Sequence, residues 1–190
     1  ARYEALQALM IDLLVARVSG RPAEADPVIA AVGTTLAQAA NDPAFVAEAC
    51  VLPTESFIGD QMLVVDPATI RRERRALQAA LGSSHDGVWR ALLAEASPDA
   101  ADLSPLAKGR RKLRSLALMM LWASKADDAP GIALREYQNA GGMTDRMAAL
   151  GVLAHSEAPE RETALAAFYD RFRNNALVLD KWFSVQAFSL

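Results

Sequence analysis

The sequence is poor in the residues that build cross-links and metal sites. Its 190 residues include one cysteine, Cys50, and two histidines, His85 and His155. One cysteine excludes an internal disulfide and suits a reducing compartment, and the first residues lack the basic and apolar regions of a signal peptide, so we expect a cytoplasmic protein. Neither histidine has a second histidine or cysteine at a metal-ligand spacing, so no zinc site is predicted. We expect structural or exposed histidines and a Cys50 that packs in the core.

Long apolar runs and an excess of positive charge are absent as well. Apolar residues make up 52% of the sequence. Charged residues interrupt them well before the roughly 18 consecutive apolar residues that indicate a membrane span. The 20 basic and 23 acidic residues leave a net charge of −3, and neutralising phosphates requires a cationic excess. We therefore expect neither a membrane nor a nucleic acid as a partner.

Basic residues nevertheless gather in two clusters within predicted helices. We predict that each cluster forms a solvated face or lines an internal cavity. The arginines of the second cluster, on the longest predicted helix, are candidates for a cavity wall. The clusters are Arg71, Arg72, Arg74 and Arg75, and Lys108, Arg110, Arg111, Lys112 and Arg114.

Patterns typical of strands and of common active sites are also missing. β-Branched residues never alternate with polar ones over more than a few positions. No nucleophile elbow, P-loop or dinucleotide-binding glycine pattern occurs, and Gly141-Gly142 is only a turn signal. Acidic residues at Asp127-Asp128 and at Glu157, Glu160 and Glu162 flank predicted helix starts, where negative charge favours the helix dipole. We predict no catalytic, cofactor-binding or metal-binding residue in this chain.

Helix signals, by contrast, recur along the whole chain. Alanine, the best helix former, supplies 39 of the 190 residues. A capping side chain followed by proline predicts helix starts at Asp26-Pro27, Asp42-Pro43, Asp66-Pro67 and Ser104-Pro105. About ten or eleven such helices with short linkers predict an all-α fold. We expect stacked antiparallel helix pairs in a superhelical, bowl-like α-α solenoid, with residues 1–190 forming a single helical domain.

This assignment includes several local predictions. Asp86 and Thr144 are expected to cap the helices that follow them, and Gly82 to end the helix that begins after Asp66. The inward residues of the helix after Asp86 are expected to be Val88, Leu92 and Leu93. The residues expected opposite the apolar stripe of the longest helix are Lys108, Arg111 and Lys112.

Four short stretches carry a family resemblance. The strongest are 142–150, Gly-Met-Thr-Asp-Arg-Met-Ala-Ala-Leu, and 175–183, Asn-Ala-Leu-Val-Leu-Asp-Lys-Trp-Phe. Two upstream stretches agree with them, 52–55, Leu-Pro-Thr-Glu, and 65–71, Val-Asp-Pro-Ala-Thr-Ile-Arg. In order and spacing they resemble the C-terminal helical domain of the bacterial zinc aminopeptidase N (alanyl aminopeptidase) family. The likeness runs from about Ala49 to the last residue, and Gly142 stands where the family usually has asparagine.

The resemblance implies that this chain is part of a metallopeptidase that removes N-terminal residues from peptides. In that family an H-E-x-x-H helix and a distant glutamate hold zinc, and a G-A-M-E-N loop holds the substrate amine, all in upstream domains. None of these motifs occurs here, so we expect zinc in the parent enzyme and no cofactor or catalytic residue in this fragment. Its helices would enclose the substrate cavity, with the upstream catalytic domain of the same polypeptide and peptide substrates as partners.

The ends of the sequence also indicate a piece of a longer protein. The chain opens at Ala1 without an initiator methionine and remains apolar through Phe188 to Leu190. Residues 1–190 are therefore predicted to be an incomplete piece of a larger C-terminal domain. One alternative is a free-standing helical-repeat module that grips a partner protein on its concave surface. Another is a nucleic-acid binder that uses the basic helices.

Overall fold

A computed structural model describes residues 2–189, and this range contains eleven α-helices and no β-strand. The helices are α1 (Arg2–Val18), α2 (Asp26–Leu36), α3 (Pro43–Ala49), α4 (Glu55–Gly59), α5 (Pro67–Ser84), α6 (Asp86–Ala94), α7 (Pro105–Ala123), α8 (Ala129–Asn139), α9 (Met143–Ala154), α10 (Pro159–Phe172) and α11 (Ala176–Ala187). The all-α prediction and the expected number of helices are confirmed. Ala1 and Leu190, on which the prediction of a truncated chain depends, lie outside the described residues.

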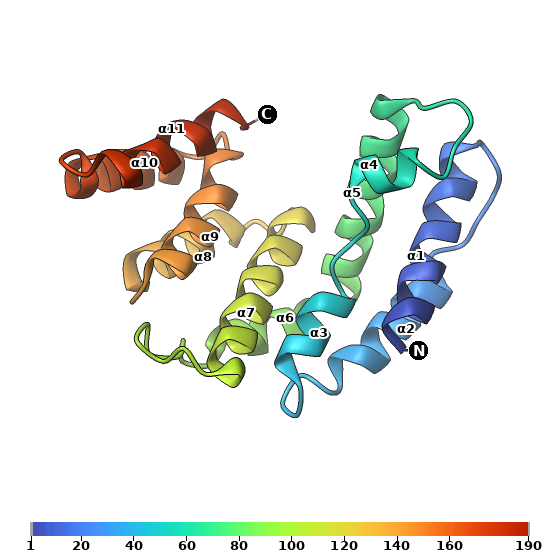
Figure 1. Cartoon of the computed structure of the whole chain (residues 1–190), viewed down its shortest axis with the longest axis horizontal. Coiled ribbons are helices and arrows are strands. Elements are labelled where there is room, and N and C mark those ends of the chain that lie inside the picture. The colour runs from blue at the N-terminus through green and yellow to red at the C-terminus, as the bar shows by residue number, and fades with distance from the viewer. Residues whose placement is uncertain (1, 190) are drawn as a thin grey trace.

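The helices are arranged in succession along an arc, with α1 and α2 at one end and α10 and α11 at the other (Figure 1). The long helix α7 lies in the middle and packs against α3, α5, α6, α8 and α9. Beyond it, α8 packs on α9, α9 on α10, and α10 on α11. Because most helices contact only their neighbours along the arc, the array is a helical-repeat arrangement. The predicted stack of helix pairs is confirmed.

Three of the predicted capping residues begin their helices as expected. The side chains of Asp42, Asp66 and Ser104 accept hydrogen bonds from backbone N–H groups in the first turns of α3, α5 and α7, at 3.0 to 3.2 Å. A proline follows each of them, where its missing N–H costs no hydrogen bond. These starts are set locally, so they could be predicted from two adjacent residues.

Three other capping predictions are wrong. Asp26 and Asp86 are the first residues of α2 and α6, and neither helix has a side-chain cap. Thr144 lies inside α9, which begins at Met143 after an uncapped Gly142. Acidic and hydroxyl residues are favourable both at the cap and in the first turn. The sequence therefore locates such starts only to within a residue or two.

Two glycines allow α7 to approach its neighbours closely. A Cβ at Gly82 would lie 2.2 Å from the Met120 carbonyl oxygen in α7, and a Cβ at Gly109 would lie 2.7 Å from the Ala44 backbone nitrogen in α3. Gly82 does not end its helix, as predicted, because α5 continues to Ser84. Its role is to bring two helix backbones into contact.

The buried face of α6 differs in part from the predicted one. Leu92 and Leu93 pack against the core as predicted, whereas Val88 is 40% exposed and Trp89 is completely buried. The Trp89 indole N–H donates a 3.1 Å hydrogen bond to the Leu81 carbonyl in α5. A large ring with a satisfied N–H contributes more buried area than valine, so α6 turns its tryptophan toward the core.

Candidate functional site

The cysteine and the histidines occupy structural positions. Cys50 is completely buried, and this burial raises the pKa of its thiol to about 12, which keeps the sulfur protonated and unreactive. His85 Nε2 lies 3.0 Å from the Ile29 carbonyl oxygen, and His155 Nδ1 lies 2.8 Å from the Gly151 carbonyl oxygen at the end of α9. The prediction of a core cysteine is confirmed. Within residues 2–189, no three histidine, cysteine, aspartate or glutamate side chains are grouped as metal ligands would be.

Arg111 of α7 is buried, so the prediction that it lies on a solvated face is wrong. Only 7% of its surface is exposed. Its guanidinium donates to the Asp99 carbonyl at 3.1 Å and to the Asp102 carbonyl at 2.7 Å. Both acceptors belong to the loop between α6 and α7, which folds back over α7. The helical pattern of α7 does not predict that this loop packs over it. The buried charge of Arg111 is tolerated because the two carbonyl oxygens accept hydrogen bonds from its guanidinium.

Arg114, one turn further along α7, ties the end of α6 to α8. Its Nη1 donates to the carbonyls of Leu92 at 3.1 Å and Leu93 at 2.8 Å, and also to that of Glu95. Its Nη2 pairs with the Glu136 carboxylate at 2.5 Å. These bonds satisfy the last carbonyls of α6, which lack partners within the helix. The guanidinium groups of Arg111 and Arg114 are therefore both engaged by contacts within this chain.

The exposed cations of α7 are Lys108, Arg110 and Lys112. Lys112 forms an ion pair with Glu48 of α3. These three residues remain candidates for a cavity wall, because their charged heads reach solvent. Lys108 and Lys112 are four residues apart and share one side of α7, whereas Arg110 lies on the opposite side of the helix.

The cluster on α5 is exposed at three of its four arginines. Arg71, Arg72 and Arg75 lie at the surface, which confirms the predicted solvated face there. Arg74 is partly buried, and its Nε donates a 2.7 Å hydrogen bond to the Pro53 carbonyl. Burial lowers the pKa of Arg74, and the nearby Glu55 opposes this shift. Arg74 thus holds the 52–55 stretch of the family motif against α5.

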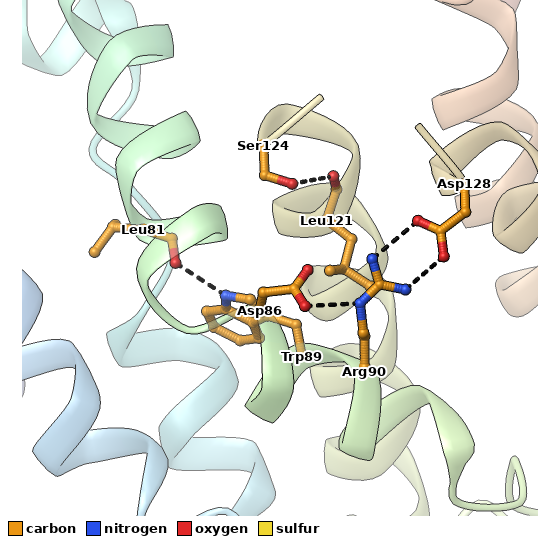
Figure 2. A network of polar contacts seen from close by, with 7 residues as sticks. All are labelled: Leu81, Asp86, Trp89, Arg90, Leu121, Ser124 and Asp128. Carbon is orange, nitrogen blue, oxygen red and sulfur yellow. Dashed lines mark hydrogen bonds and ion pairs between the residues drawn. The ribbon is translucent and has the colours of Figure 1, made fainter. Parts of the chain in front are cut away.

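Arg90 connects α6 to the start of α8. Its guanidinium forms an ion pair with Asp86 of α6 at 2.7 Å (Figure 2). It also binds both carboxylate oxygens of Asp128, the residue directly before α8, at 2.7 and 2.9 Å. Hydrogen bonding to Asp128, then to Asp86, raises the pKa of Arg90, and hydrogen bonding to Arg90 lowers that of Asp128. Asp128 was predicted to serve a helix start; it makes no capping bond to α8 and binds Arg90 instead.

The motif residues of the family resemblance also perform structural tasks. Asn175 caps α11 by accepting from the Val178 N–H at 3.3 Å. The Trp182 indole donates to the Leu165 carbonyl at 2.9 Å, which fixes α11 on α10. Asp145 accepts a 2.7 Å hydrogen bond from the Ser97 hydroxyl, so α9 also holds the loop before α7. These contacts give Asn175, Trp182 and Asp145 structural roles in this array.

The α10/α11 end of the arc exposes apolar surface. No residue of α11 is fully buried, and Leu177, Phe183 and Phe188 are 81%, 56% and 79% exposed. A shallow groove of about 290 Å³ also runs between α10 and α11, lined in part by Tyr169 and Trp182. Exposed apolar area of this kind is typical of a surface that another segment covers.

The geometry therefore defines a class of protein, a curved helical-repeat array. None of its helices in the range 2–189 is long and apolar enough to cross a bilayer. Comparison with known proteins identifies the family. The chain belongs to the DUF3458_C family of ARM-repeat domains, described as a domain of unknown function, and the match extends over residues 1–190.

The relatives found by comparison are aminopeptidases. The chain is 33% identical to aminopeptidase N of Caulobacter vibrioides over 97% of its length, and 29% identical to aminopeptidase N of Escherichia coli over its full length. It spans only 22% of each of these two relatives. These matches confirm the resemblance to the helical domain of the aminopeptidase N family.

A solved structure confirms the fold. The chain superposes on Legionella pneumophila aminopeptidase A, solved in complex with aspartic acid, with a TM-score of 0.83. The superposition covers 99% of this chain and 23% of that protein, at 23% sequence identity.

Proposed function

We propose that this chain is part of the C-terminal helical domain of a zinc aminopeptidase that removes N-terminal residues from peptides. The observation that carries the proposal is the similarity of almost the whole chain to proteins named aminopeptidase N. In this proposal residues 1–190 form one helical domain, which is itself a piece of a larger one. Its partners are the upstream catalytic domain and peptide substrates, and its compartment is the cytoplasm. The free-standing module is not favoured, because the matching region is about a fifth of each relative.

The role of the chain is to shape and enclose the substrate cavity. Catalysis in a closed cavity gains from excluding bulk water and unsuitable substrates, which requires a rigid wall. The arginine contacts described above supply this rigidity. Arg111 holds the loop before α7, Arg114 ties the end of α6 to α8, and Arg90 joins α6 to the start of α8.

The residues of this chain do not fit the zinc ion of such an enzyme. Cys50 is buried and protonated, and no cluster of metal-ligating side chains occurs between residues 2 and 189. A zinc site requires three or four such ligands converging on one point. The metal ligands and the reacting groups would therefore belong to the upstream part of the polypeptide.

Two measurements test the parent activity. The reading frame upstream of residue 1 should encode an H-E-x-x-H motif, and the longer polypeptide should release the N-terminal residue from an aminoacyl anilide. The 190-residue chain alone should neither bind zinc stoichiometrically nor hydrolyse the anilide. A start codon directly before this segment, or peptidase activity in the purified segment, would contradict the proposal.

The wall function has its own test in the longer enzyme. Replacing Lys108 and Lys112 by glutamine should change KM for peptides several-fold if this face of α7 lines the cavity, while kcat for a small anilide stays the same. A matched variant with glutamine at Arg72 and Arg75 of α5 controls for loss of surface charge. Equal effects of the two variants on KM would show that this face of α7 does not line the cavity.

A further inference from the structure

Two guanidinium groups lie near the ring of Phe172, where α8, α9 and α10 pack together. The Arg146 Cζ atom, from the first turn of α9, lies 5.9 Å from the ring centre of Phe172 and 5.9 Å from that of Tyr137. The Arg171 Cζ atom, from the last turn of α10, lies 5.4 Å from the same Phe172 ring. Two positive charges therefore gather around one aromatic ring.

Neither charge has an acidic partner within the described part of the chain. Arg146 is only 7% exposed, and its one hydrogen bond runs from Nη2 to the Ala140 carbonyl at 2.6 Å. Asp145, its neighbour in sequence, accepts from Ser97 instead. Buried arginines are rare unless they are paired, because removing the charge from water is costly. A single carbonyl and two rings leave most of the five donors of this guanidinium unused.

The unused donors can be reached from solvent. Among residues 2–189, the one completely buried side-chain nitrogen or oxygen without a partner is Arg161 Nε. The remaining donors of Arg146 and the Tyr137 hydroxyl, which makes no hydrogen bond in this range, are therefore not completely buried. Burial, followed by the charge of Arg171, lowers the pKa of Arg146. Burial raises the pKa of Tyr137, and both arginines act in the opposite direction. The three groups thus share one electrostatic environment.

We propose that Arg146, Arg171 and the Tyr137 hydroxyl form a binding site for an oxyanion, either a carboxylate or a phosphate. Guanidinium groups bind both through paired, charge-assisted N–H···O bonds. The anion would supply the negative charge that the fold itself does not place beside Arg146, and it would relieve the repulsion between the two arginines. This site does not depend on the parent enzyme being an aminopeptidase.

The test follows the Nε–H signals of both arginines by NMR while the 190-residue chain is titrated with sodium phosphate or sodium acetate at constant ionic strength. Saturable shifts of both signals are expected with at least one anion. R171Q, which changes an exposed side chain, should weaken binding about tenfold, as expected for losing one charge-assisted hydrogen bond. R135Q removes an exposed arginine of α8 and should leave binding unchanged.

Further variants separate a binding role from a packing role. R146M keeps the apolar contact with both rings and should abolish the saturable response, while Y137F should weaken it. Saturation by acetate alone assigns the site to carboxylates, and saturation by phosphate alone assigns it to phosphates. The proposal is overturned if neither anion produces a saturable shift, or if R171Q binds as tightly as R135Q.

Discussion

Replacing Gly82 with alanine tests whether backbone contact between α5 and α7 sets the spacing of the array. A Cβ there would lie 2.2 Å from the Met120 carbonyl oxygen and 3.0 Å from the Ser124 Cβ. Alanine is favoured over glycine inside a helix by up to about 1 kcal/mol. Overpacking costs about 1 to 3 kcal/mol, and the upper end applies because a backbone oxygen cannot rotate away. We expect G82A to lower the free energy of unfolding by about 2 kcal/mol.

Urea unfolding followed by circular dichroism measures this change. With an m-value of about 2 kcal/mol/M, the midpoint should fall by about 1 M. G151A is the matched control, since Gly151 lies inside α9 and a Cβ there would meet no atom within 4 Å. It should raise stability by about 0.5 to 1 kcal/mol. If G82A proved as stabilising as G151A, α5 and α7 could not be in contact at this position.

Three further predictions address the polar and buried groups. R114M should lower the free energy of unfolding by about 3 kcal/mol, because several carbonyls lose a charged donor. R110M, at an exposed position, should change it by less than about 0.5 kcal/mol. Similar losses from the two variants would show that Arg114 does not stabilise the contact of α6 with α7 and α8. Native Cys50 should resist a thiol reagent at about pH 8 and react in urea, since its pKa is raised to about 12. The stability that the Cys50 thiol contributes should be complete below its pKa in the unfolded state and should decline as the pH rises through its pKa in the folded state. Rapid labelling of the native protein would contradict the burial of Cys50. Hydrogen bonding to an arginine lowers the pKa of Asp128, so its contribution is present above the ordinary carboxyl pKa and is lost on acidification. D128N lacks this carboxylate and D127N keeps it, so the thermal midpoint of D128N should fall less than that of D127N between roughly pH 6 and pH 3. Equal falls would argue against the ion pair between Arg90 and Asp128.

The helical class of this protein could be predicted because its signals are local. Proline after a capping side chain at Asp42, Asp66 and Ser104 sets three helix starts through bonds within one turn. The placement of Cys50 in the core also followed from its apolar neighbours and the lack of a basic one. The family resemblance rested on the order and spacing of four short stretches, and Asn175 and Trp182 in one of them make contacts within adjacent elements.

The uses of the arginines could not be predicted in the same way. Arg111, Arg114 and Arg74 look like members of a polar face in sequence, but each binds a carbonyl from another part of the chain. A long side chain can bury its stem and direct its charge to any nearby acceptor. The pairing of Arg146 with two aromatic rings was likewise missed, and the sequence contains no signal that would have located it.

The sequence by itself determined that this protein is a series of amphipathic helices without a disulfide or a motif for metal binding, because helix periodicity and caps depend on residues a few positions apart. Only the tertiary structure decided which charges are solvated, which glycines permit close contact and which aromatic ring lies near two arginines. Those properties depend on residues far apart in the chain, and local patterns contain no record of which loop or helix will pack over them.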